Sequence, residues 1–163
     1  MRVGILVFEG VEELDFVGVY EVLSKVKTMV EEKKLEVKPL EVETFGLQDE
    51  VRCAQGLILK PHKNTLNFDS YDVVVLPGGR GVLDLEDEKR LLENLKKFSE
   101  EKILCSVCTG AFLLAWSGVL KGRKATTHQN AKKALRKYCE VLDERVVVDK
   151  NIITAGGVSC SLD

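Results

Sequence analysis

Short apolar runs alternate with amphipathic segments along most of the chain. Residues 2–8, 71–76 and 103–107 are dominated by aliphatic side chains, as expected for strands that are buried on both faces of a parallel sheet. Residues 35–45 instead alternate apolar and charged positions, which is typical of a strand with one exposed face. The pattern therefore predicts three buried strands and one half-exposed strand.

Helical periodicity separates these strands. Residues 83–99, 109–117 and 131–138 are predicted as helices. Strands that alternate with helices imply right-handed crossovers, so the expected fold is α/β, a doubly wound, mainly parallel sheet sandwiched by helices. The first helix is predicted over residues 11–27, where the apolar positions are Leu14, Val17 or Phe16, Val19, Val22, Leu23 and Val26.

Smaller elements complete the pattern. Residues 51–59, around Gly56, are predicted to form a short hairpin, and residues 125–127 a short strand. A closing pair of strands is expected over 141–148 and 152–154. Ligands bind beyond the carboxyl ends of the strands in such sheets, so the site is expected in the loops that follow them.

Cys108 lies where the strand over 103–107 meets the next helix. An apolar strand, a small-residue turn and an apolar helix resemble a nucleophile elbow, which lifts one reactive side chain above a parallel sheet. A thiolate there would lie near the positive end of the helix dipole, so we expect a lowered pKa and a reactive thiol. The alternative is an inert core cysteine.

Composition limits the class of protein. The 163 residues are 45% hydrophobic with a net charge of −2, which predicts one domain with a substantial core. A nucleic-acid surface would need a clustered basic face. The densest basic stretch, over residues 121–124 and 132–137, is interpreted as a solvated helix face. No nucleic-acid partner is expected.

The cysteines and the first residues suggest a location. The chain opens without the basic start and long apolar run of a signal peptide, and no segment has the length of a membrane span. Its five cysteines are then expected to be reduced thiols in the cytoplasm. No membrane partner is expected.

Four motifs, in order along the chain, resemble the ThiJ/PfpI superfamily. Within it, they are most similar to the isonitrile hydratase branch and to the sensor domains of certain AraC-type regulators. The resemblance implies a flavodoxin-like fold, a homodimer and Cys108 as the nucleophile. The motifs are Leu76-Pro77-Gly78-Gly79, Ser106-Val107-Cys108-Thr109-Gly110, Gly122-Arg123-Lys124-Ala125-Thr126-Thr127-His128 and Gly156-Gly157-Val158-Ser159.

The resemblance also implies an acidic partner for the thiol, at Asp15. A protonated carboxyl there would hydrogen-bond the thiolate and later donate its proton, which requires a raised pKa in a partly dry site. The alternative is that Asp15 only stabilises the amino end of the first helix, as Glu12 and Glu13 could.

Substrate-binding groups are implied at Gly78, Gly79 and Thr109. In the family, the amide of the second glycine and the amide after the nucleophile line an oxyanion site, here Gly79 and Thr109. The protease-like branch has His after the cysteine, and Thr109 cannot act as that base. Its hydroxyl could instead hydrogen-bond Asp15 or a substrate atom, or Thr109 could simply begin the helix.

His128 follows Thr126-Thr127 at an expected strand end and is a candidate second base or substrate-binding group, or a hydrogen-bonded packing residue. His62 is expected to be exposed.

Cys105 and Cys108 form a Cys-x-x-Cys pair, but a disulfide along an extended strand is geometrically poor. Ligand spacings for zinc and the Lys-Ser/Thr of a phosphate loop are absent. No metal and no cofactor are expected.

Residues 1–163 are interpreted as a single ThiJ/PfpI-like domain that stops where the family's final helix begins. The leading function is a cofactor-free cysteine enzyme that hydrates a small electrophile, as isonitrile hydratases do in making N-substituted formamides. Cys108, Asp15 and Thr109 would be catalytic. The alternatives are a glyoxalase or deglycase, an intracellular peptidase-like hydrolase, and a non-enzymatic redox or ligand sensor.

Overall fold

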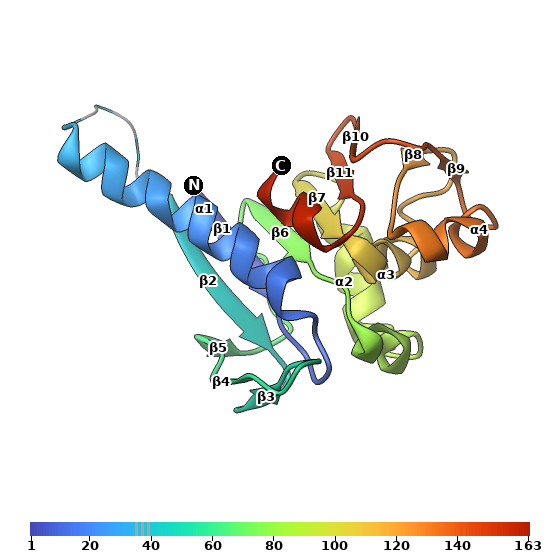
Figure 1. Cartoon of the computed structure of the whole chain (residues 1–163), viewed down its shortest axis with the longest axis horizontal. Helices are drawn as coiled ribbons and strands as arrows, with labels where there is room; N and C mark the ends of the chain where they lie inside the picture. The colour runs from blue at the N-terminus through green and yellow to red at the C-terminus, as the bar shows by residue number, and fades with distance from the viewer. Residues whose placement is uncertain (35, 37, 39) are drawn as a thin grey trace.

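The computed structural model describes residues 1–34, 36, 38 and 40–163, and it has a seven-stranded sheet at its centre (Figure 1). The strand order is β10-β11-β7-β6-β1-β2-β5. All neighbouring strands in this sheet are parallel except the β10–β11 pair at one edge. The prediction of a mainly parallel sheet is confirmed.

The central strands are β1 (Arg2–Leu6) and β6 (Val73–Leu76), which are almost entirely buried, and β7 (Ile103–Val107), which is buried except at Ile103 and in part at Cys105. From β1 the chain moves outward to β2 (Glu41–Gly46) and the short edge strand β5 (Lys63–Asn64). It then returns to the other side of β1 and continues through β6 and β7 to the closing pair. The two windings separate between β1 and β6, the position where doubly wound sheets bind ligands.

Helices cover both faces of the sheet, as predicted. In Figure 1, α1 (Glu13–Glu32) and the last turn, η4 (Val158–Leu162), lie together on one face. Helices α2 (Lys89–Phe98) and α3 (Ala111–Trp116) pack together on the other.

The remaining elements are short and lie around this core. They are the antiparallel pair β3 (Val51–Arg52) and β4 (Ile58–Leu59), the parallel pair β8 (Lys124–Ala125) and β9 (Glu140–Val141), the edge strands β10 (Val146–Asp149) and β11 (Ile152–Ala155), helix α4 (Lys132–Leu135), and the 3-10 turns η1 (Arg80–Leu85), η2 (Cys108–Gly110) and η3 (Gln129–Ala131).

Several predicted boundaries are wrong. The helix predicted over 83–99 is the turn η1 followed by α2, and the helices predicted over 109–117 and 131–138 also begin as 3-10 turns. The strand predicted over 141–148 is interrupted between β9 and β10. The prediction over 35–45 is confirmed from Glu41 onward, and residues 35, 37 and 39 of that stretch lie outside the described residues.

Helix α1 also differs from its predicted burial pattern. Phe16 is buried, whereas Leu14, Val17, Val22 and Val26 are 40–44% exposed. Val19 and Leu23 pack against the core as predicted. The helix carries apolar residues on more than one face, so periodicity alone selects the core set only in part.

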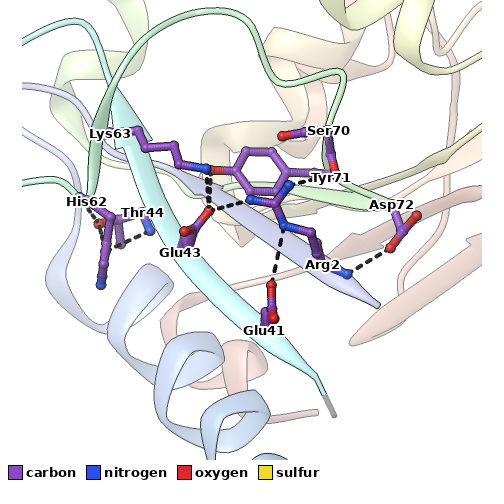
Figure 2. Close-up of polar contacts among 9 residues, drawn as sticks. All are labelled: Arg2, Glu41, Glu43, Thr44, His62, Lys63, Ser70, Tyr71 and Asp72. Carbon is purple, nitrogen blue, oxygen red and sulfur yellow. Dashed lines mark hydrogen bonds and ion pairs between the residues drawn. The ribbon is translucent and has the colours of Figure 1, made fainter. Parts of the chain in front are cut away.

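A charged network stabilises the sheet away from the carboxyl ends of the central strands (Figure 2). Glu43 on β2 accepts hydrogen bonds from the Tyr71 hydroxyl and from Arg2, both at 3.1 Å, and pairs with Lys63 at 2.9 Å. The Tyr71 ring lies against Gly4 of β1, where any side chain would overlap it. Hydrogen bonding to Lys63 is the main reason that the pKa of Glu43 is lowered. Every charge here has a partner, so the network has a structural role.

His62 is exposed, as predicted. Its Nδ1 lies 2.8 Å from the Thr44 hydroxyl, and its ring stacks on Tyr20 of α1. No helix in the described part of the chain is long and apolar enough to cross a membrane.

Candidate active site

Cys108 occupies a strained turn at the end of β7. Its φ is 56°, in the left-handed region that non-glycine residues rarely adopt. Neighbouring segments hold both backbone polar groups of this residue: its amide donates to the Gly156 carbonyl at 2.7 Å, and its carbonyl accepts from the Thr127 hydroxyl at 2.7 Å. Such strain persists only where the surroundings fix it, and it is concentrated at functional sites. The local geometry is that of the expected elbow.

Asp15 lies beside this turn, in the first turn of α1. The residue is 0% exposed, and its Oδ2 accepts a hydrogen bond from the Gly78 amide at 2.9 Å. Its other oxygen, Oδ1, is buried and has no hydrogen-bond partner among the described residues. Burial raises the pKa of Asp15 to about 6, and the charge of Glu12 adds to the effect. The carboxyl can therefore exchange a proton near neutral pH.

The Cys108 thiol does not have the lowered pKa that the sequence predicts. Burial, followed by the negative charge of Asp15, raises its pKa to about 12. Hydrogen bonds from the Thr109 amide and hydroxyl act in the opposite direction but do not outweigh these two effects. At neutral pH the proton resides on sulfur, and the adjacent carboxylate is the group placed to accept it.

Gly78 and Gly79 fit closely between the two reactive groups. A Cβ on Gly78 would lie 2.7 Å from the amide nitrogen and the hydroxyl of Thr109 and 2.8 Å from Asp15 Oδ2. Gly79 has a φ of 124°, which favours glycine. Because these two residues have no side chain, the loop after β6 can lie against both α1 and the elbow.

The Thr109 hydroxyl is hydrogen-bonded to the Gly79 amide, which is one of the two predicted oxyanion donors. The Gly79 amide donates to the Thr109 hydroxyl at 3.2 Å, so that amide is engaged within the protein. For Gly79 to bind a developing charge, the Thr109 hydroxyl has to turn away. The role of the Gly79 amide as an oxyanion donor stays a prediction, as do the catalytic roles of Cys108, Asp15 and Thr109.

A cavity of about 630 Å³ opens over the thiol. Cys108, Thr109, Gly79 and His128 all line it. The Nδ1 atom of His128 accepts a hydrogen bond from the Asn130 amide at 3.3 Å, which places the proton of a neutral ring on Nε2. The described residues contain no hydrogen bond between His128 and Cys108, and no group of three acidic, His or Cys residues that could hold a metal ion.

Some residues around the elbow and in the cavity were not identified as functional from the sequence. Thr127 holds the elbow carbonyl, and its position directly before His128 was the available signal. Phe112 and Trp116 line the cavity four and eight residues after Cys108, a helical spacing that places them on the same side as the nucleophile. Tyr138 completes the aromatic lining from the chain after α4.

Comparisons with known proteins agree with this fold. The crystal structure of Drosophila melanogaster DJ-1beta matches with a TM-score of 0.84 at 24% identity, over 99% of this chain and 84% of that chain. Isonitrile hydratase of Pseudomonas putida is 31% identical over 100% of this chain and 68% of its own length. Deglycase PfpI of Pyrococcus furiosus is 35% identical over 55% of each protein.

The family profile named DJ-1/PfpI matches residues 1–163. Its relatives include enzymes that are named as an isonitrile hydratase and as deglycases. The match extends over all four motifs, including the strained cysteine, and confirms the resemblance seen in the sequence. The chain belongs to the DJ-1/PfpI family.

Proposed function

We propose that this protein is a cysteine-dependent enzyme that adds water to the terminal carbon of an isonitrile and releases an N-substituted formamide. The observation that carries the proposal is the Asp15–Cys108 pair: a buried carboxyl with a pKa of about 6 beside a protonated thiol on a strained turn. The 31% identity to isonitrile hydratase over the whole chain supports it.

The first half of the reaction forms a covalent adduct. Asp15, as the carboxylate, removes the proton from the Cys108 sulfur while the sulfur attacks the isonitrile carbon. That carbon carries a lone pair, and Asp15 returns the same proton to it. The product is a thioimidate, with a carbon–sulfur single bond, a carbon–nitrogen double bond and one new carbon–hydrogen bond. The unpartnered Oδ1 of Asp15 is suited to this transfer, because no other group competes for it.

The second half hydrolyses the adduct. Asp15 takes a proton from water as the water oxygen adds to the thioimidate carbon, and the nitrogen receives that proton. The carbon–sulfur bond then breaks. The hydroxyl proton passes through Asp15 to sulfur, so the thiol is regenerated and one water has been added to the isonitrile. The Thr109 amide hydrogen-bonds the sulfur, which stabilises it as a leaving group.

A glyoxalase or deglycase is the second candidate, because His128 lines the same cavity as Cys108 and deglycase PfpI is a relative. In that chemistry His128 would act as a base. Its Nδ1 already accepts the Asn130 amide, which leaves Nε2–H as a donor rather than a base. Thr109 in place of a histidine argues against a peptidase triad.

The test is formamide production by the purified chain from benzyl isonitrile, followed by NMR, with methylglyoxal as the competing substrate. We expect formamide from the wild type, a loss of at least about 1,000-fold in Cys108→Ser, and little change in His128→Ala. Turnover of methylglyoxal alone, abolished by His128→Ala, would instead establish the second candidate. Turnover of neither substrate would favour a redox or ligand sensor.

A further inference from the structure

The cavity continues well beyond the reacting groups, along one side of α3. Phe112 and Trp116 follow Cys108 at intervals of four residues and line the cavity in the same row. At about 1.5 Å of rise per residue, Trp116 lies roughly 6 Å further along α3 than Phe112. A substrate of two or three atoms would occupy only the first part of the cavity. The remainder is available to whatever group the reacting carbon carries.

Three aromatic rings form the floor of this extension, and we call them the aromatic floor: Phe112, Trp116 and Tyr138. The Phe112 and Trp116 rings are 5.7 Å apart and tilted by 45°, and the Tyr138 ring meets Phe112 edge-on at 6.5 Å. Phe112 and Trp116 are partly exposed, and Tyr138 is 40% exposed. Ring surface therefore remains accessible from the cavity.

The walls beside the floor are also apolar. Val82 and Leu83 of η1 line the cavity, as do Ala131 and Ala134. Of the polar residues that also line the cavity, Glu12 is partly exposed and Arg80, Glu86, Asn130 and Lys137 are exposed, so their polar ends can remain in water. A polar substituent would lose hydration here without gaining a buried partner, whereas an aromatic one would gain ring contacts.

We propose that the aromatic floor binds the N-substituent of the substrate, and that the enzyme prefers isonitriles with aryl or arylmethyl substituents over those with small alkyl groups. Phe112 is the specificity-determining residue, because it lies nearest to Cys108 in the row and touches both other rings. The reaction named here rests on the proposed function, but the binding preference does not require turnover. Contact with aromatic rings is expected to favour an aryl ligand by roughly 2- to 10-fold per ring.

Trp116 provides a direct readout, because it is the one tryptophan of the chain. The full-length Cys108→Ser variant, which cannot form the adduct, is titrated with N-benzylformamide, N-cyclohexylmethylformamide and N-methylformamide while tryptophan fluorescence is recorded. We expect saturable binding of the benzyl compound with a Kd at least about tenfold lower than that of the methyl compound. The cyclohexylmethyl compound, equally apolar but without a ring π-system, is expected to lie between them.

Phe112→Leu keeps the wall apolar and removes one ring. In the Cys108→Ser background it is expected to remove most of the benzyl preference over cyclohexylmethyl, while Tyr20→Leu, which replaces an aromatic residue of α1 outside the cavity, leaves the preference intact. Equal affinities for benzyl and methyl compounds, or an unchanged preference in Phe112→Leu, would overturn the proposal.

The two proposals fail separately. If the wild type hydrates methyl and benzyl isonitrile with equal kcat/KM, the assigned reaction stands and the role of the aromatic floor is wrong. If the benzyl preference appears in binding but no isonitrile is hydrated, the aromatic floor stands and the reaction is wrong.

Discussion

The Thr127 hydroxyl donates a 2.7 Å hydrogen bond to the carbonyl oxygen of Cys108. Thr127 is 0% exposed and lies after β8, 19 residues along the chain from the elbow. The backbone amide of Cys108, in the preceding peptide unit, donates to the Gly156 carbonyl. A residue with a φ of 56° is thus held from two separate segments, which is how a strained turn is kept in place without a glycine.

Replacing the Thr127 hydroxyl by a methyl group is expected to release this turn. Thr127→Val keeps the size of the side chain but leaves the buried Cys108 carbonyl without its partner, so we expect a loss of about 1–3 kcal/mol in stability and a drop in kcat of at least about tenfold. Thr127→Ser, which retains the hydroxyl, is the matched control and should keep most of the activity. Equal kcat values for the two variants would show that the hydrogen bond does not position the nucleophile. Urea unfolding and steady-state kinetics measure both effects.

The Asp15 carboxyl is expected to be needed for turnover but not for thiol reactivity. Asp15→Asn cannot accept or deliver the proton, so isonitrile hydration should fall at least about 100-fold. The charge of Asp15 raises the pKa of Cys108, and its removal should therefore let iodoacetamide label Cys108 at least as fast as in the wild type. Peptide mass mapping measures the labelling.

Asp69→Asn, at an exposed position, is the control for the loss of a carboxylate and should leave both readouts unchanged. If Asp15→Asn hydrates isonitriles as fast as the wild type, Asp15 only supports the amino end of α1, which is the alternative that the sequence leaves open.

The positions of the buried strands along the chain and the position of the elbow could be predicted because they depend on local patterns. The apolar runs of β1, β6 and β7 favour buried strands, and small residues after β7 permit the turn at Cys108. The family resemblance added Asp15, which periodicity alone would not have brought to the thiol.

The pKa of Cys108 was predicted in the wrong direction, because it depends on groups that come together only in the fold. The dipole argument uses the residues directly after Cys108, whereas the larger effects come from burial and from Asp15, 93 residues earlier in the chain. Likewise, the Gly79 amide is engaged because the Thr109 hydroxyl lies within 3.2 Å of it, and no sequence pattern specifies a rotamer.

The raised pKa of Asp15 makes a prediction about stability. Below a pH of about 4 the carboxyl is protonated in both states. As the pH rises to about 6, the unfolded chain releases this proton while the folded protein retains it. The folded state then binds more protons than the unfolded state, so its stability falls through this window, by a total on the order of 3 kcal/mol.

The Asp15→Asn variant has no carboxyl to titrate at this position, so it does not lose stability through this pH window. We expect the variant to be more stable than the wild type at a pH of about 7.5, with the difference shrinking as the pH falls towards about 4. Urea unfolding at several pH values measures it. A stability difference that does not change with pH would contradict the raised pKa of Asp15.

The exposed apolar residues of α1 bear on the homodimer that the sequence analysis expects. Val22, Val26 and Met29 lie on one side of the helix and are 41–47% exposed. Leu162 of η4 packs beside Gly18 on the same helix and is 55% exposed. Exposed apolar residues grouped in this way favour contact with another protein surface, and a second copy of the chain supplies a self-complementary one.

We therefore predict that the protein self-associates through α1. Light scattering at micromolar concentration should give about twice the 18.2 kDa mass of the chain. Val26→Glu places a charge within the apolar surface and should shift the mass to that of a monomer, because an unpaired carboxylate in an interface is strongly unfavourable. Leu57→Glu, at an equally exposed position in the β3–β4 hairpin, should leave the dimer intact. A wild-type mass of 18.2 kDa would contradict the prediction, and a dimer that survives Val26→Glu but not Leu57→Glu would move the interface from α1 to the hairpin.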